Sequence, residues 1–103
     1  MSNTREIQQI TDKIREKFVV ISIILFGSYA YGKPEAVSDI DLCIITDENR
    51  RKLDIIREIR KTVAPVANKP LDILVYRNDE FHSRASIKST LEYKIKNEGV
   101  YLL

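Results

Sequence analysis

The stretch LFGSYAYGKPEAVSDIDLCII (residues 25–45) places a Gly-Ser pair and an Asp-x-Asp pair between two apolar runs. Residues 19–26 form a continuous β-branched and apolar run that stops at Gly27, which is typical of a strand buried on both faces. Residues 39–46 predict a second strand. The first strand therefore ends, and the second begins, in residues that add nothing to a core, which indicates a functional site at those ends.

The Asp-x-Asp pair predicts a metal site. Side chains alternate across a strand, so Asp39 and Asp41 share one face while Ile40, Leu42 and Ile44 face a core. Two such carboxylates about 4 Å apart repel by roughly 4 kcal/mol at an effective dielectric near 20, and a divalent cation removes that conflict. Hard oxygen ligands favour Mg²⁺, with Mn²⁺ as the alternative, and Mg²⁺ fills its other positions with water and phosphate oxygens. The expected ligand carries phosphate.

The Gly-Ser pair predicts the other half of such a site. A glycine at the end of a buried strand allows a sharp turn and a close approach to a ligand. The N–H groups that follow Gly27, with the hydroxyl of Ser28, can bind phosphate oxygens at a helix N-terminus. Asp72 lies one residue into a third predicted strand, and it joins the same face if that strand lies beside the second. It would then act as a metal ligand or as a proton acceptor.

The other elements alternate between helix and strand. The pattern predicts a first helix with an Asn3 and Glu6 cap, a second helix starting at Asp47 and Glu48, and a third strand over residues 71–76. A last helix is closed by Gly99, with residues 100–103 as an edge strand or packed on the core. The apolar stripes expected on the three helices are Ile7, Ile10, Ile14 and Phe18; Leu53, Ile56, Ile59 and Val63; and Ile87, Leu91 and Ile95. The order predicts an α/β or α+β fold with helices packed on one sheet.

Length and composition limit the possible functions. The 103 residues predict one domain, residues 1–103, without room for a second substrate-binding lobe. The net charge is +2 and the basic residues are dispersed, so direct nucleic-acid binding is not favoured. Cys43 is the single cysteine, which excludes an internal disulfide and suits a reducing compartment. No signal peptide or membrane span is evident, so we expect a soluble, cytoplasmic protein with no membrane association.

Each feature alone also has an ordinary structural interpretation. Gly-Ser after a strand is usually a turn, Asp-x-Asp at a strand end is usually solvated, and Asp72 after a proline can be a turn residue. We expect Cys43 to be a small buried hydrophobic group and His82 to lie on the surface. The combination is different, because Gly-Ser-x10-Asp-x-Asp arises by chance on the order of once in a hundred thousand start positions.

GSYAYG followed by SDIDL resembles the Gly-Ser-x10-Asp-x-Asp signature of the nucleotidyltransferase superfamily that includes DNA polymerase beta. The short chain is similar to its minimal nucleotidyltransferase branch over essentially its whole length. The resemblance implies a mixed sheet with flanking helices, and transfer of a nucleoside monophosphate from an NTP such as ATP to an acceptor hydroxyl with loss of pyrophosphate. It also implies a partner: many members are antitoxins of a HEPN-domain ribonuclease, and some adenylylate a tyrosine of that toxin, so we expect a hetero-oligomer.

The same resemblance assigns roles to residues. It implies that Asp39, Asp41 and Asp72 are the catalytic and metal-binding aspartates and that Gly27 and Ser28 contact the nucleotide phosphates. Ser38 and Lys33 are expected to contribute to the nucleotide site.

One position departs from the family pattern. Many members carry arginine where this chain has Tyr31, and an arginine neutralises phosphate charge in a way that a phenol does not. Lys33 is one candidate for the missing charge. Two alternatives to protein adenylylation stay open at this point: a nucleotide-binding module that neutralises a partner by occlusion, and a small-molecule nucleotidyltransferase whose acceptor pocket forms between subunits.

Overall fold

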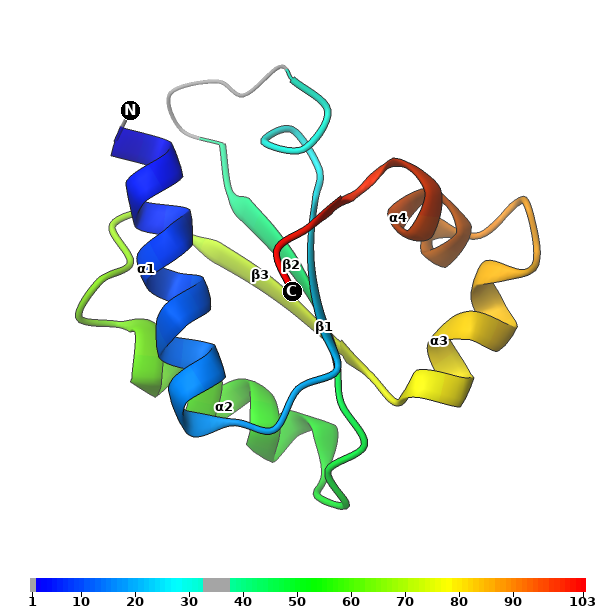
Figure 1. Cartoon of the computed structure of the whole chain (residues 1–103), viewed down its shortest axis with the longest axis horizontal. Helices are drawn as coiled ribbons and strands as arrows, with labels where there is room; N and C mark the ends of the chain where they lie inside the picture. The colour runs from blue at the N-terminus through cyan, green and yellow to red at the C-terminus, as the bar shows by residue number, and fades with distance from the viewer. Residues whose placement is uncertain (1, 33–37) are drawn as a thin grey trace.

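The structure, a computed structural model, describes residues 2–32 and 38–103, and this part of the chain forms helices on both faces of a mixed sheet (Figure 1). The elements are α1 (Ser2–Lys17), β1 (Ser22–Phe26), β2 (Ile40–Ile45), α2 (Lys52–Val63), β3 (Leu71–Tyr76), α3 (Asn78–Ala85), α4 (Leu91–Glu98) and β4 (Val100–Tyr101). The strand order is β3-β2-β1-β4, with β2 and β3 parallel and the other pairs antiparallel. The predicted fold class is confirmed.

Two helix pairs cover the sheet, α1 with α2 on one face and α3 with α4 on the other (Figure 1). The core under α1 and α2 includes Ile10, Ile14, Ile55 and Ile59, which are at most 2% exposed. The core under α3 and α4 is smaller and is centred on Phe81, which is fully buried. Burial on both faces explains why the strands read as continuous apolar runs.

The alternation along β2 decides which face carries each side chain. Ile40, Leu42 and Ile44 belong to the core under α1 and α2, as predicted. Cys43 belongs to the core under α3 and α4, and it is a buried hydrophobic group as expected. Because Asp41 alternates in phase with Cys43, its side chain projects from the α3/α4 face of the sheet.

Several predicted boundaries and faces are wrong for identifiable reasons. The first strand begins at Ser22, and Val19, which the apolar run includes, is 80% exposed. The second helix begins at Lys52, and its buried face runs through Ile55, Ile59 and Val63, so Leu53 is exposed. An apolar residue in the first turn of a helix need not face the core, and a stripe drawn by spacing alone included it.

The C-terminal region contains two helices where one was predicted. Thr90 caps α4 by accepting a hydrogen bond from the Tyr93 N–H (3.1 Å), so the chain turns before it and α3 is separate. Ile87 and Leu91, two of the three residues of the predicted stripe, are exposed. The alternative of an edge strand is confirmed, because Val100 of β4 pairs with Leu25 of β1.

The predicted cap of the first helix is replaced by a tertiary contact. Glu6 is 5% exposed and accepts hydrogen bonds from the backbone N–H groups of Asn68 (2.6 Å) and Lys69 (3.0 Å). Its carboxylate also lies 3.5 Å from the Lys69 ammonium. Glu6 therefore fastens α1 to the loop before β3. Within the described residues, no helix is long and apolar enough to cross a membrane.

Candidate active site

The site lies where the end of β1 meets the starts of β2 and β3. Asp41 pairs with Asp72 across the parallel β2–β3 ladder, and it pairs with Phe26, the last residue of β1, across the antiparallel ladder. Residues paired directly across a ladder project from the same face of the sheet, so the carboxylates of Asp41 and Asp72 are neighbours on the α3/α4 face. The condition set for Asp72, that its strand lies beside the second, is met.

Gly27 is required by the carboxylate of Asp41. The glycine has φ +74°, a conformation that L side chains rarely adopt, so any substitution there is strained. A Cβ added to it would also overlap Oδ2 of Asp41 and lie 2.9 Å from the Asp41 Cγ. The Asp41 carboxyl group therefore rests directly against the Gly27 backbone, which joins the acidic half of the site to the Gly-Ser half.

A single helix-like turn follows Gly27. Its carbonyl oxygen accepts hydrogen bonds from the backbone N–H groups of Ala30 and Tyr31, each 3.0 Å long. The backbone N–H groups of Ser28 and Tyr29, in between, donate to no acceptor among residues 2–32 and 38–103. The predicted helix N-terminus is thus only a turn, yet it presents successive backbone donors as a phosphate site needs.

The carboxylates interact electrostatically. The pKa of Asp41 is raised from 3.8 to about 6, first by burial and then by a side-chain hydrogen bond with Asp72 and by the charges of Asp72 and Asp39. Asp39 and Asp72 are themselves exposed to solvent. The protein thus holds negative charge at one place before any ligand is bound.

The donor set fits Mg²⁺, although its geometry is open. Within the described part of the chain, no group of three His, Cys, Asp or Glu side chains forms a ready-made metal site. Asp41 and Asp72 lie together, with Asp39 beside them at the exposed start of β2. One or two carboxylates with phosphate and water oxygens are the usual Mg²⁺ environment, so these residues suit a metal that arrives with a nucleotide.

The other predicted site residues differ in what can be said of them. Ser28 lies in the turn after Gly27 and is half-buried. Ser38 is half-buried and directly precedes Asp39. Lys33 lies outside the described residues.

Comparison with known proteins identifies the family. The model of the nucleotidyltransferase domain family matches residues 7–97, which includes all of the predicted site residues. The chain belongs to the nucleotidyltransferase domain family. The predicted superfamily and enzyme class are confirmed at this level.

Two individual proteins resemble this nucleotidyltransferase domain. "Putative protein adenylyltransferase MJ1379" of Methanocaldococcus jannaschii is 43% identical over 53 residues, which are 48% of this chain and 53% of that protein. The chain thus matches about half the length of this curated relative. A crystal structure of a "putative nucleotidyltransferase" from Sulfolobus solfataricus superposes with a TM-score of 0.60 over 94% of this chain and 76% of that one, at 17% identity. This second likeness shows the shared fold.

Sequence reasoning missed one residue near the candidate site. The Lys94 ammonium group, on α4, lies 4.7 Å from the centroid of the Tyr31 ring. Tyr31 belongs to the turn that follows Gly27, and the charge of Asp41 reaches its hydroxyl. No local pattern signals this contact, because 63 residues separate the two positions and only the packing of α4 on β1 brings them together.

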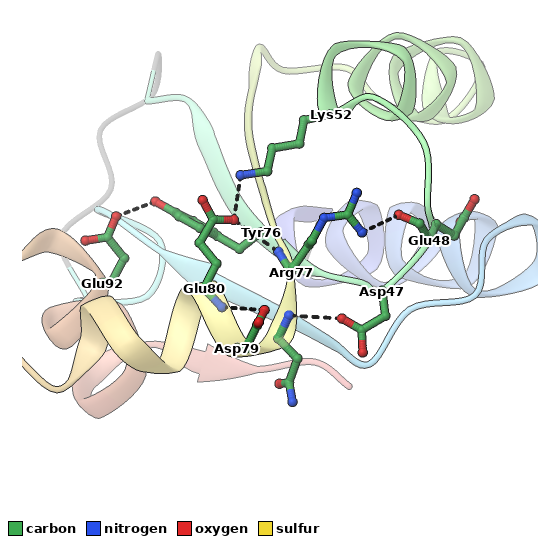
Figure 2. Close-up of polar contacts among 9 residues, drawn as sticks. Asp47, Glu48, Lys52, Tyr76, Arg77, Asp79, Glu80 and Glu92 are labelled. Atoms are coloured by element: carbon green, nitrogen blue, oxygen red, sulfur yellow. Dashed lines mark hydrogen bonds and ion pairs between the residues drawn. The ribbon is translucent and has the colours of Figure 1, made fainter.

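A second polar cluster lies at the opposite end of β3 (Figure 2). The Tyr76 hydroxyl donates to Glu92 of α4 (2.5 Å), and the Lys52 ammonium of α2 donates to Glu80 of α3 (2.5 Å). Tyr76 is four residues beyond Asp72 on the same strand, a separation of about 13 Å. These contacts join the two helix layers at the end of the sheet away from the site. His82, also on α3, makes an edge contact with Phe81 and is exposed, as expected.

Proposed function

We propose that the protein is a Mg²⁺-dependent nucleotidyltransferase that moves AMP from ATP to a hydroxyl group. The observation that carries the proposal is the position of the Asp41 carboxyl group, which lies against the Gly27 backbone and beside Asp72. A phosphate held on the turn after Gly27 would thereby lie next to the paired carboxylates. Membership of the nucleotidyltransferase domain family supports the same reaction class.

Different residues would bind the metal and the phosphates. Asp41 and Asp72, with Asp39 beside them, would hold Mg²⁺, and the N–H groups and hydroxyl at Ser28 would bind phosphate oxygens. Ser38 and Lys33 remain assigned to the nucleotide site as predictions. When bound, Mg²⁺ supplies charge neutralisation at the phosphates and lowers the pKa of a coordinated hydroxyl. The raised pKa of Asp41 fits a carboxyl group that awaits a cation.

The transfer is a nucleophilic substitution at the α-phosphorus. The acceptor oxygen forms a bond to that phosphorus, the bond from the α-phosphorus to the bridging oxygen breaks, and pyrophosphate leaves with the bonding electron pair. The hydroxyl proton passes to a carboxylate, for which exposed Asp72 is the candidate because an incoming acceptor can reach it.

A partner protein is the acceptor that suits this chain best. The described residues form one sheet with its helices, and the predicted site lies at one end of the strands of that sheet instead of between two lobes. The Methanocaldococcus jannaschii relative, named for protein adenylylation, supports a protein acceptor, although this chain matches only about half of it. We therefore propose a tyrosine of a HEPN-type ribonuclease as acceptor, with this protein as its antitoxin in a cytoplasmic hetero-oligomer. A tyrosine hydroxyl has an ordinary pKa of about 10, within reach of activation near neutral pH.

One observation favours a second function. The described residues contain no ready-made three-ligand metal site, and Asp39 is exposed. A slow or inactive site would leave a nucleotide-binding module that silences the same partner by covering its surface.

Intact-mass spectrometry separates these two functions. A HEPN-type ribonuclease is incubated with ATP, Mg²⁺ and either the wild-type protein or Asp41→Asn, and RNA cleavage is assayed in parallel. We expect the partner to gain the mass of AMP and lose activity only with the wild type. Asp12→Asn, an exposed carboxylate on α1 hydrogen-bonded to Gln8, is the matched control and should behave as the wild type. If the wild type and Asp41→Asn inhibit the ribonuclease equally and the ribonuclease gains no mass, the proposed transferase activity is wrong and the protein acts as the occluding module.

A further inference from the structure

The helix α4 is fixed against the strand that leads into the site. A Cβ added to Gly99, directly after α4, would lie 2.5 Å from the Ile95 carbonyl oxygen and 2.6 Å from Cγ2 of Ile24 on β1. Ile95 and Ile24 are both fully buried in the core under α3 and α4. The helix is thus packed at close range on the sheet face from which Asp41 projects, beside the turn that follows β1 (Figure 1).

The side chain of Tyr31 is close both to this helix and to the site. Its hydroxyl oxygen is buried and makes no hydrogen bond of good geometry within the described residues, although it lies near enough to the Gly27 backbone to interact with it. Burial raises the pKa of Tyr31, and the charges of Glu98 on α4 and of Asp41 in the site add to that rise. The phenol therefore interacts electrostatically with both α4 and the carboxylates of the site.

Lys94 is seated on this ring. Its ammonium group lies 4.7 Å from the ring centroid, within the range of a cation–π interaction. The Lys94 side chain is exposed, and no carboxylate among residues 4–32 and 38–103 forms an ion pair with it. Its charge is thus held beside the phosphate-binding turn by an uncharged ring and stays available to an anion.

A polyphosphate needs such a cation at this site. The three aspartates repel it, and one divalent ion neutralises only part of the charge of a triphosphate. The α-phosphate must lie where the carboxylates and the acceptor meet, whereas the Lys94 ammonium group lies over the ring of Tyr31 and forms no ion pair with Asp41 or Asp72. The phosphates beyond the α position are therefore the ones within its reach.

We propose that Lys94, held in place by the ring of Tyr31, binds the β- and γ-phosphates of the nucleotide and the pyrophosphate as it leaves. The inference rests on the proposed function, since it assigns a residue to the same nucleotide site. It differs from the sequence-based assignment of this charge to Lys33. It also gives Tyr31 a role as the positioning residue for Lys94.

Calorimetric titration with ATP, AMP and inorganic pyrophosphate tests the proposal. Lys94→Gln should weaken ATP and pyrophosphate binding about tenfold, the effect of losing one charge-assisted contact, and AMP binding less than twofold. Lys96→Gln, two residues along α4 and also exposed, is the matched control and should leave all three affinities unchanged. The titrations are run with Mg²⁺ and again with EDTA, because a direct contact between Lys94 and phosphate persists without metal.

The positioning role of the ring is tested separately. Tyr31→Leu should weaken ATP binding at least threefold more than Tyr31→Phe, which retains an aromatic ring for the ammonium group. In the Tyr31→Leu background, Lys94→Gln should have a smaller effect than in the wild type. Circular dichroism melting of each variant shows whether it is folded at the titration temperature.

The outcomes separate this inference from the proposed function. Unchanged ATP affinity in Lys94→Gln, or an equal loss for ATP and AMP, overturns the role of Lys94 even where the wild type transfers AMP. A selective loss of triphosphate and pyrophosphate affinity supports that role even where the wild type transfers nothing. Absence of nucleotide and pyrophosphate binding by the wild type overturns both proposals.

Discussion

Replacing Asp41 with asparagine should stabilise the metal-free protein at neutral and alkaline pH while abolishing nucleotidyl transfer. The folded protein raises the pKa of Asp41 from 3.8 to about 6, so it binds more protons than the unfolded chain between these values. Stability is therefore lost as the pH rises through this window, and the full loss is present above about pH 7. The amide that replaces the carboxyl group carries no charge, so the variant avoids that loss.

The size of the gain follows from the shift. About two pKa units correspond to roughly 3 kcal/mol at 1.36 kcal/mol per unit, but Asp41 is only half-buried and solvent screens its neighbours. A gain of about 1 kcal/mol in the free energy of unfolding is the reasonable expectation. For a domain of this size, that gain corresponds to a rise of about 4–8 °C in Tm.

The assay is thermal unfolding followed by circular dichroism at pH 4 and pH 8 in EDTA. Asp41→Asn should exceed the wild type at pH 8 and approach it at pH 4, where Asp41 is protonated in the folded protein and the pH lies close to its unfolded pKa of 3.8, so most of the loss is absent. Asp12→Asn, on the surface of α1, should show no such pH-dependent gain. The reasoning is refuted if Asp41→Asn is less stable than the wild type at pH 8, or if its gain is the same at both pH values.

Three further variants test other parts of the structure. Gly27→Ala should lower the free energy of unfolding, measured by urea titration, by about 1–3 kcal/mol more than Gly32→Ala does. Both glycines have positive φ, but only Gly27 has the Asp41 carboxyl group against it. Equal losses of stability in the two variants would contradict this close contact. Tyr76→Phe should cost about 1–3 kcal/mol in the same assay by leaving buried Glu92 without its hydroxyl partner, and a loss of nucleotide affinity at constant fold would place that cluster in the site instead. Tyr31→Arg should raise the rate of transfer, measured by release of pyrophosphate, because a guanidinium group stabilises charge on the leaving group; a fall in rate would mean that displacing Lys94 outweighs the added charge.

The acidic half of the site was predictable because it depends on strand alternation alone. Asp39 and Asp41 fall on one face whatever surrounds the strand, and the apolar residues between them report which face is the core. The break after the first strand was equally evident from Gly27. Its contact with Asp41 was not, because that contact depends on the register between β1 and β2, which no local pattern specifies.

Features that depend on tertiary packing could not be predicted from the sequence. The short α3 is held by Phe81 and Ala85, two buried residues that are too few to produce a recognisable helical stripe. Glu6 looked like a capping residue because its spacing from Asn3 is correct, yet it binds backbone 62 residues away. Lys94 is an ordinary exposed lysine until α4 is packed against β1.

The mixed sheet itself explains why these residues can form one site. Because β1 runs antiparallel to β2, the Gly-Ser turn that ends β1 lies at the end of the sheet where β2 begins with its aspartates. Because β3 runs parallel to β2, its first residues, including Asp72, lie at that same end of the sheet. A fully parallel arrangement of the three strands would place the Gly-Ser turn at the opposite end of the sheet, about 15–20 Å away for strands of five or six residues. The antiparallel pairing of β1 with β2, beside the parallel pairing of β2 with β3, is therefore what brings phosphate-binding backbone and carboxylates together.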